Sequence, residues 1–493
     1  MRLCDVATLC TNRIPYKTLL PGIPKIPIMW DLSSLERSFH AYLAKIDRVT
    51  PSVHRGDILG ELSARYDFST PKPLDAIVDD VERWMLTGVL HSNHPRFFGL
   101  FNPQVRFASV VADLIVAAAN PQVGAWFHAP AAVEIEEHTL RFFAHKFGMP
   151  DATAHFTSGG SEANLTAVLV AIERAFPAAR VDGMRAIAKR PVFFLSAEAH
   201  HSFDKIAQQT GLGRSAVRFV DVDEHDRMRI DALERAIADA RERGEAPFLV
   251  VATAGTTGTG AIDPLRDIAD LCRDEGLWLH VDAAWGGAAA ATHTLRHHLD
   301  GIELADSITC DAHKWLSVPM AAGMFFTPHG DAVLRAFGTN TPYVPKSAGP
   351  ELYRESVQWS RRFIGLKLFM AMAELGEEGL ARQIEHHAEI AAYLRDCVAA
   401  AGWTLVNDSP LAVVCFTHPS IATAEACRAR AEAIVGRGRC WISPLIREGR
   451  VPALRACVTG YATTREDVDA LIEELTLGAS APAASRPPVE TRA

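Results

Sequence analysis

Between about residue 106 and residue 365, short apolar runs alternate with stretches of helical spacing. The apolar runs lie at 191–195, 248–252, 277–281 and 307–310. The helical stretches between them include 162–175, 230–242 and 264–275. Strand–helix alternation of this kind is typical of a domain in which helices cover a largely parallel sheet. We therefore predict an α/β fold with a mainly parallel central sheet.

The chain is predicted to divide into four parts. Residues 1–105 form an N-terminal helical and extended segment, and residues 106–370 form the large domain. Residues 371–479 form a small C-terminal α+β domain. Residues 480–493, rich in alanine, proline and arginine, are expected to be a disordered tail.

The pattern of the small domain differs from that of the large one. A long amphipathic helix is expected at 378–401 and a closing helix at 465–475. Three short apolar runs are predicted as strands, at 412–416, 440–443 and 454–459.

Composition indicates a soluble cytoplasmic enzyme. The net charge of −9 argues against nucleic acid or an anionic membrane as a partner. Prolines interrupt the apolar residues 19–30, and the run at 107–119 is too short to span a bilayer, so no membrane segment is expected. The nine cysteines form no CxxC pair, and their odd number suits reduced thiols. No metal site is predicted.

A lysine and an upstream aspartate suggest a pyridoxal phosphate site. Lys314 lies in the sequence DAHKW, and Asp282 lies in HVDAAWGG at the end of an apolar strand. Such a lysine can form a Schiff base with the aldehyde of the cofactor, while the aspartate keeps the pyridine nitrogen protonated. A buried carboxylate is costly unless it is paired, and a pyridinium nitrogen would pair with it. The alternative for Asp282 alone is a helix cap or an internal salt bridge.

Three further segments place candidate ligands beside this pair. Gly160 and Ser161, in TSGGSEAN, precede an apolar helix whose N-terminal N–H groups can bind a phosphate, although Ser161 can equally serve only as a cap. His200 follows a predicted strand and could stack on a pyridine ring, but its neighbour His201 leaves the choice open. Thr253 ends another strand, where its hydroxyl could reach the cofactor or the substrate, or simply form part of a turn.

Taken together, these motifs resemble the group II pyridoxal phosphate-dependent amino acid decarboxylases, over roughly residues 75–475. This family includes the aromatic L-amino acid, glutamate, cysteine sulfinate, histidine and diaminobutyrate decarboxylases. The resemblance implies fold type I and a homodimer with its active sites at the subunit interface. It also implies pyridoxal 5'-phosphate as cofactor and loss of carbon dioxide from an L-amino acid.

The resemblance also assigns roles to particular residues. Lys314 would bind the cofactor covalently, Asp282 would pair with the pyridine nitrogen, His200 would stack on the ring and Ala284 would lie beneath it. The phosphate ligands would be Gly160, Ser161 and His313, and Thr253 would lie near the 3-oxygen. Tyr343 matches a loop tyrosine that protonates the substrate carbanion in relatives. Asp311 and Ala312 depart from the Asn-Pro that many relatives carry, which puts the local phosphate contacts in doubt.

The substrate is predicted from a weaker signal. The sequence HPRFF at 94–98 and Trp285 resemble the glutamate and cysteine sulfinate branch, but Gly99 and Leu100 replace the Asn-Gln of that branch. We expect an apolar or aromatic substrate side chain, in a pocket lined by Phe97, Phe98, Leu100 and Phe101. The alternative is that these four residues belong to the core.

Other readings of the reaction remain open. Arg455 occupies the place of an arginine near the substrate carboxylate in relatives, or forms a structural ion pair. An acidic substrate and oxidative decarboxylation-deamination to an aldehyde are the alternative reactions. A noncatalytic homologue is disfavoured by the presence of Lys314, Asp282 and His200.

Overall fold

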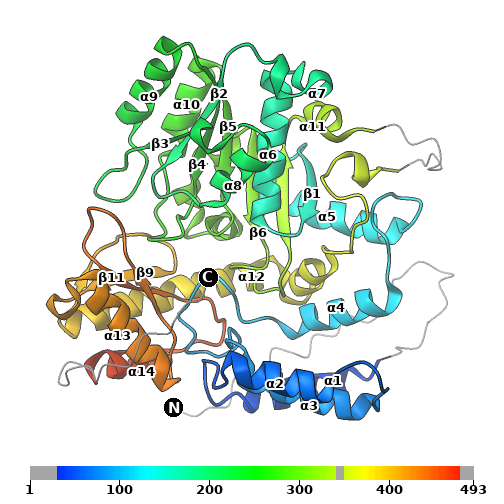
Figure 1. The fold of residues 1–493 in the computed structure, drawn as a ribbon, viewed down its shortest axis with the longest axis vertical. Coiled ribbons are helices and arrows are strands. Elements are labelled where there is room, and N and C mark those ends of the chain that lie inside the picture. Colours follow the sequence, from blue (N-terminus) through cyan, green and yellow to red (C-terminus); the bar gives the residue numbers. More distant parts are fainter. Residues whose placement is uncertain (1–29, 340–348, 478–493) are drawn as a thin grey trace. The chain divides into compact units, whose positions relative to one another are not determined.

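The large sheet is built mainly from the predicted apolar runs. The computed structural model describes residues 30–339 and 349–477. Its seven-stranded sheet has the order β1-β7-β6-β5-β4-β2-β3 (Figure 1). These strands are β1 (Thr153–Thr157), β2 (Pro191–Ser196), β3 (Val217–Val220), β4 (Ala246–Thr253), β5 (Trp278–Asp282), β6 (Ser307–Asp311) and β7 (Gly323–Thr327).

The sheet is mainly parallel. Neighbouring strands from β3 to β6 pair in parallel, whereas β7 is antiparallel to both β1 and β6. The predicted α/β class is therefore confirmed. The short strands β1, β3 and β7 were not predicted, because runs of four or five residues carry little periodic signal.

Both faces of the sheet are buried, as its apolar strands require. Along β4, Leu249 and Val251 face one apolar cluster while Val250 and Ala252 face another, because successive side chains point to opposite faces. Helix α6 (Gly160–Ala175) packs across strands β4 to β7 on one of these faces (Figure 1). Its N-terminus is thereby brought to the carboxyl ends of the parallel strands.

The remaining helices of the large sheet region follow the strand–helix alternation. They are α4 (Phe107–Ala119), α5 (Pro130–Lys146), α7 (Ala179–Asp182), α8 (Ser202–Gln209), α9 (Ile230–Glu242), α10 (Leu265–Glu275) and α11 (Gly330–Phe337). Before them lie α2 (Arg55–Arg65) and α3 (Leu74–Gly88).

A second, antiparallel sheet forms near the C-terminus. Its order is β10-β11-β9-β8, and its strands are β8 (Thr404–Leu405), β9 (Val413–Thr417), β10 (Ser443–Leu445) and β11 (Ala453–Cys457). The accompanying helices are α12 (Leu366–Ala400), α13 (Ala424–Arg437) and α14 (Arg465–Thr476). Helix α12 is kinked at Gly376, whose φ of 68° suits glycine, so the helix predicted from residue 378 is the part after this kink.

The chain forms two compact units that meet between Ala44 and Lys45 in the sequence. Helix α1 (Leu32–Ala44) belongs to the first unit, and Asp31 caps it by accepting a hydrogen bond from Ser34 N at 3.1 Å. Everything described below lies in the second unit. The predicted tail at 480–493 and Tyr343 fall outside the described residues.

Candidate active site

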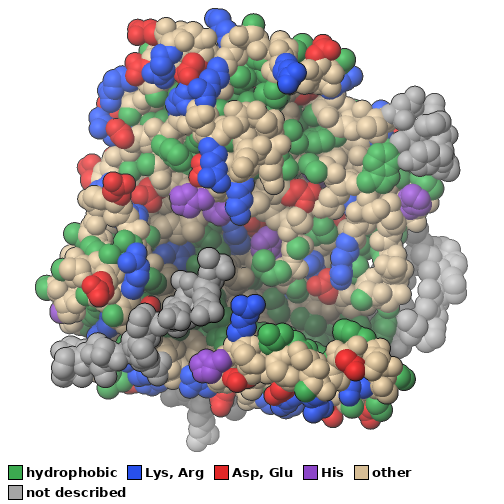
Figure 2. Space-filling view, viewed as in Figure 1, with side chains coloured by type: hydrophobic (Ala, Val, Ile, Leu, Met, Phe, Trp, Pro, Cys, Tyr) green, Lys and Arg blue, Asp and Glu red, His purple; other side chains and the backbone are tan. Residues whose placement is uncertain are grey.

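A cavity of about 330 Å³ opens at the carboxyl edge of the large sheet. Five segments supply its chemical groups: the N-terminus of α6 and the carboxyl ends of β2, β4, β5 and β6 with the residues that follow them. Ligand sites of open α/β sheets form at this edge because the strand ends and helix N-termini meet there. Figure 2 shows the face that contains this edge, with histidine and lysine or arginine side chains beside a hollow.

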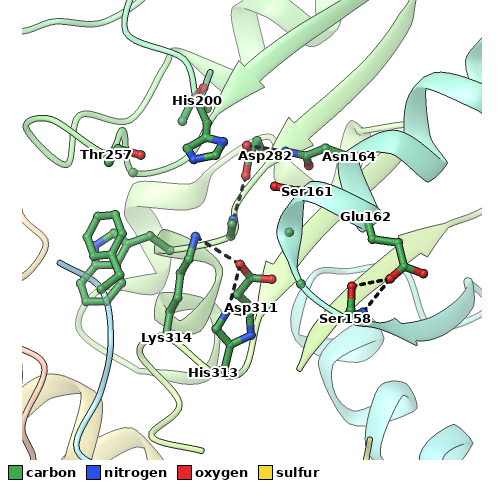
Figure 3. A pocket seen from close by; sticks show the side chains of 17 residues that line it. Ser158, Ser161, Glu162, Asn164, His200, Thr257, Asp282, Asp311, His313 and Lys314 are labelled. Carbon is green, nitrogen blue, oxygen red and sulfur yellow. Dashed lines mark hydrogen bonds and ion pairs between the residues drawn. The ribbon is translucent and has the colours of Figure 1, made fainter. Parts of the chain in front are cut away.

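Asp282 ends β5 and projects into the cavity (Figure 3). Its carboxylate accepts hydrogen bonds from Asn164 Nδ2 at 2.8 Å and from the Ala284 backbone N–H at 3.1 Å. The residue is only 5% exposed. It is thus a buried acceptor held by two neutral donors, and its remaining lone pairs are free to meet a cationic ligand atom.

Lys314 follows β6 and reaches the same cavity from the other side (Figure 3). Its Nζ lies 3.1 Å from Asp311 Oδ2 and 5.5 Å from the centre of the Phe101 ring. The next residue, Trp315, is stacked on Trp285 at 4.6 Å and donates a hydrogen bond to His387 Nδ1 at 2.8 Å. These contacts fix the backbone that carries the lysine.

Of the neighbouring histidines 200 and 201, His200 faces the cavity. Its ring lines the wall near Asp282, whereas the side chain of His201 is 91% exposed. His200 Nδ1 accepts the backbone N–H of Ser202 at 3.2 Å, and burial lowers the pKa of the ring. A neutral, flat imidazole therefore borders the cavity at neutral pH.

Gly159, Gly160 and Ser161 form a cradle at the start of α6. A Cβ on Gly160 would lie 2.8 Å from Asp311 Oδ2 and 3.3 Å from Ala284 Cβ, so only glycine allows this close approach. His313 lies opposite, and its Nδ1 accepts the backbone N–H of Ala322 at 2.9 Å. In the neutral ring, the hydrogen is therefore on Nε2, the nitrogen that lies on the Asp311 side.

The residues of this cavity fit pyridoxal phosphate. The glycine cradle and helix N-terminus suit a phosphate, the carboxylate of Asp282 suits a pyridinium nitrogen, and Lys314 can bind an aldehyde. Thr253 Oγ1 is buried and has no hydrogen-bond partner among the described residues. It is placed to bond a polar group in the cavity, because a buried hydroxyl without a partner is unfavourable.

Comparison with known proteins agrees with this geometry. The model of the pyridoxal-dependent decarboxylase conserved domain matches residues 62–418. The chain belongs to the pyridoxal-dependent decarboxylase family. It is therefore a carboxy-lyase that acts on an amino acid with pyridoxal phosphate as its cofactor. The predicted family, enzyme class and cofactor are confirmed.

Relatives in this family have different substrates in their names. The chain is 32% identical to "Acidic amino acid decarboxylase GADL1" of Bos taurus, over 78% of this chain and 78% of that protein. It is 30% identical to "Aromatic-L-amino-acid decarboxylase" of Bacillus atrophaeus, over 83% and 87%. The crystal structure of Oryza sativa TDC with PLP and tryptamine has a TM-score of 0.82 and 25% identity, covering 93% of this chain and 99% of that one. The family is thus shown, and the substrate is left open.

The four residues predicted to form a substrate pocket lie in different environments. Phe101 lines the cavity and is stacked on Trp285 at 4.2 Å. Phe97 and Phe98 are buried, with Phe97 packed against Trp441, and neither lines the cavity. Leu100 is 47% exposed. The structure therefore brings only one of the four to the site.

Arg455 lies just behind Phe101. Its guanidinium carbon is 4.8 Å from the centre of that ring, and Nη1 and Nε donate to the backbone carbonyls of Gly99, Thr257 and Gly258. The side chain makes no ion pair with a described residue, and its buried Nη2 has no hydrogen-bond partner among them. Nη2 is therefore a buried donor without a partner, on a residue that lies behind Phe101 and does not itself line the cavity.

Asp311 is the unexpected member of the site. It is 3% exposed, and Oδ2 lies between Lys314 Nζ and His313 Nε2, at 3.1 Å and 3.8 Å. Oδ1 is buried without a partner among the described residues. The carboxylate therefore occupies the region of the glycine cradle, where an anionic ligand would compete with it.

Sequence reasoning missed Asn164, Thr257 and Glu162, which also line the cavity. Asn164 lies one helical turn after Gly160, on the same face of α6, so its position was readable from the helix period. The hydrogen-bond partners of the Asn164 amide, Asp282 and His280, could not be predicted, because both lie on β5 and only the packing of α6 on the sheet brings them to Asn164.

None of the described helices is both long and apolar enough to cross a membrane.

Proposed function

We propose that this enzyme removes the α-carboxylate of an L-amino acid with an aromatic or apolar side chain and releases the amine. The substrate class is inferred from the residues that line the cavity. Phe101, stacked on Trp285, provides an apolar surface, while Lys314 is the only lysine or arginine among the described lining residues. Three carboxylates, those of Glu162, Asp282 and Asp311, line the same cavity. A second acidic group on the substrate would meet repulsion there.

The roles of the chain's own residues follow from their positions. When bound, pyridoxal phosphate supplies an electron sink for the bond that is broken at Cα. Lys314 Nζ is the nucleophile that holds the cofactor, and Asp282 is the anion that keeps its ring nitrogen protonated. His200 would offer its neutral ring face to the cofactor, and Ala284 would contact the cofactor ring as well. Thr253 Oγ1 would donate to a cofactor oxygen.

Different residues would bind the phosphate of the cofactor and the carboxylate of the substrate. Gly160 and Ser161 offer backbone N–H groups at the N-terminus of α6, and His313 offers Nε2–H. The resemblance assigns Arg455 to the α-carboxylate of the substrate, and its unpartnered Nη2 would be the donor, from a position behind Phe101 rather than in the cavity lining.

Two other reactions are the alternatives to this proposal. An acidic substrate is favoured by the names of relatives such as the Bos taurus protein. Aldehyde formation is disfavoured by Tyr343, which we propose as the proton donor to Cα on the basis of the resemblance alone. Product identification separates both from the main proposal.

The substrate class can be tested with a panel of L-amino acids. We expect carbon dioxide and the corresponding amine from phenylalanine, tyrosine or tryptophan, and little from glutamate, aspartate or cysteine sulfinate. Replacing Phe101 by leucine should lower kcat/KM for the aromatic substrate about fivefold, since an aromatic pair contributes about 1 kcal/mol. Leu100→Ala is the control, because Leu100 does not line the cavity. Turnover of acidic substrates alone would contradict the proposal, and an aldehyde product would contradict the amine.

Asp311 is expected to weaken the binding of the cofactor. Its carboxylate lies beside the cradle for a phosphate and is paired with Lys314. Asp311→Asn should tighten pyridoxal phosphate binding about tenfold, because the repulsion between two anions is removed. Absorbance titration of cofactor-free protein measures this, with Asp306→Asn, at the opposite end of β6, as a control for loss of charge. Weaker binding by Asp311→Asn alone would show that Asp311 is instead a required ligand.

We also propose a homodimer with its active sites at the interface. On α3, Leu74, Val78, Val81 and Met85 recur on one helical face and are 42–74% exposed. Apolar faces of this kind are usually covered by a partner. Sedimentation should give a dimer for the parent protein and a monomer for Val78→Glu, with Asp79→Ala as a control on the same helix. A monomeric parent would exclude this assembly.

A further inference from the structure

Five buried side chains form a chain of hydrogen bonds that ends at Asp282. Trp278, His280 and Asp282 alternate along β5 and therefore point to one face of the sheet. Asn164 from α6 and Ser307 from β6 complete the chain. All five residues are at most 6% exposed.

The links are short and continuous. Trp278 Nε1 donates to Ser307 Oγ at 2.9 Å, and Ser307 Oγ lies 2.9 Å from His280 Nδ1. His280 Nε2 lies 3.1 Å from Asn164 Oδ1, and Asn164 Nδ2 donates to Asp282 Oδ2 at 2.8 Å (Figure 3 shows this last link). Thr309 Oγ1, at 3.4 Å, is a weaker second acceptor for His280 Nε2.

The donor and the acceptor of every hydrogen bond in this chain follow from its two end residues, Asp282 and Trp278. A carboxylate can only accept, so the Asn164 amide donates to Asp282 through Nδ2 and its Oδ1 faces His280. His280 Nε2 must then carry the hydrogen, and Nδ1 of the neutral ring accepts from the Ser307 hydroxyl. That hydroxyl accepts from Trp278 Nε1, which can only donate.

Burial of His280 keeps the hydrogen-bond chain in one protonation state. It lowers the pKa of His280 to about 4, so the ring is neutral at neutral pH and has only one hydrogen. The chain therefore has a single polarity, with all donors directed toward Asp282. Aligned hydrogen bonds polarise one another, and those that end on a charged acceptor are the stronger ones.

We propose that Asn164 and His280 are positioning residues that hold the Asp282 carboxylate, in orientation and in charge, for the ring nitrogen of pyridoxal phosphate. The proposal rests on the role of Asp282 given above. Asp282 has no cation among its hydrogen-bond partners in the described chain. Its charge is therefore stabilised by the donors on Asn164 and Ala284. The Asn164 donor is strengthened by the residues behind it.

The test is the absorption spectrum of the bound cofactor as a function of pH, measured on the purified holoenzyme. His280→Leu removes both ring nitrogens and should shift the pH midpoint of the spectrum, weaken cofactor binding several-fold and lower kcat about tenfold with little change in KM. His280→Gln restores a donor and an acceptor and should recover most of each effect. Trp278→Phe removes only the outermost donor and should give a smaller shift in the same direction.

The pattern of outcomes distinguishes this proposal from the role of Asp282 itself. If Asp282→Asn changes the spectrum but a folded His280→Leu variant keeps the parent's midpoint and cofactor affinity, the hydrogen-bond chain has no such role. If Asp282→Asn also leaves the spectrum unchanged, the proposed role of Asp282 itself is wrong, and the role of the hydrogen-bond chain is wrong with it. If His280→Leu does not fold, Trp278→Phe decides, and a parent-like midpoint in that variant contradicts the proposal.

Discussion

Replacing Lys314 by alanine is expected to abolish turnover, with a loss of about 10³-fold or more, because the nucleophile that holds the cofactor is removed. The Nζ of Lys314 faces the cavity and pairs only with Asp311 among the described charged groups, so the fold should tolerate the change. Melting temperature and circular dichroism of the variant should therefore stay close to those of the parent.

Chemical trapping locates the covalent link directly. After borohydride reduction, the peptide that contains Lys314 should carry the mass of the cofactor in the parent and not in Lys314→Ala. Lys205→Ala, an exposed lysine on the nearby helix α8, should behave as the parent. A cofactor mass on another lysine of the parent would contradict the assignment.

The second large effect is expected at Asp282. Asp282→Asn keeps the size of the side chain and the space at the end of β5 but removes its negative charge. The ring nitrogen of the cofactor would lose its anionic partner in a buried site, and kcat should fall about 10²–10⁴-fold. The cofactor should still be held by Lys314, so the loss appears in kcat rather than in cofactor content.

A conservative variant provides the control for Asp282. Asp282→Glu retains the charge and should keep more activity than Asp282→Asn, although its longer side chain disturbs the bonds to Asn164 and Ala284. Steady-state kinetics and the cofactor spectrum measure both variants. Parent-like turnover by Asp282→Asn would remove the aspartate from the mechanism.

Local motifs predicted the central residues because their chemistry is local. Lys314 and Asp282 each follow an apolar strand, and strand ends of a parallel sheet converge at one edge, so their meeting could be expected. Gly160 was predictable for the same reason, as the start of a helix that must reach that edge. The strand order and the antiparallel β7 could not be read, since they depend on long-range pairing.

Residues whose role depends on side-chain direction were harder to predict. Phe97, Phe98 and Phe101 are the same residue type and lie close together in the sequence, yet only Phe101 lines the cavity. Asp311 departs from the sequence that many relatives carry, but its pairing with Lys314 depends on the turn after β6 and could not be predicted. The Asn164–His280 link joins residues that are far apart in the sequence, and no motif indicated it.

The most direct test of the account follows the carboxyl carbon of an aromatic L-amino acid. Phenylalanine labelled with an isotope only at that carbon is incubated with the holoenzyme, and the gas and the remaining product are analysed by mass. We predict labelled carbon dioxide and an equal amount of unlabelled amine from the parent, and neither from Lys314→Ala. Label retained in the product, or an active parent that releases labelled carbon dioxide only from acidic amino acids, would contradict the account.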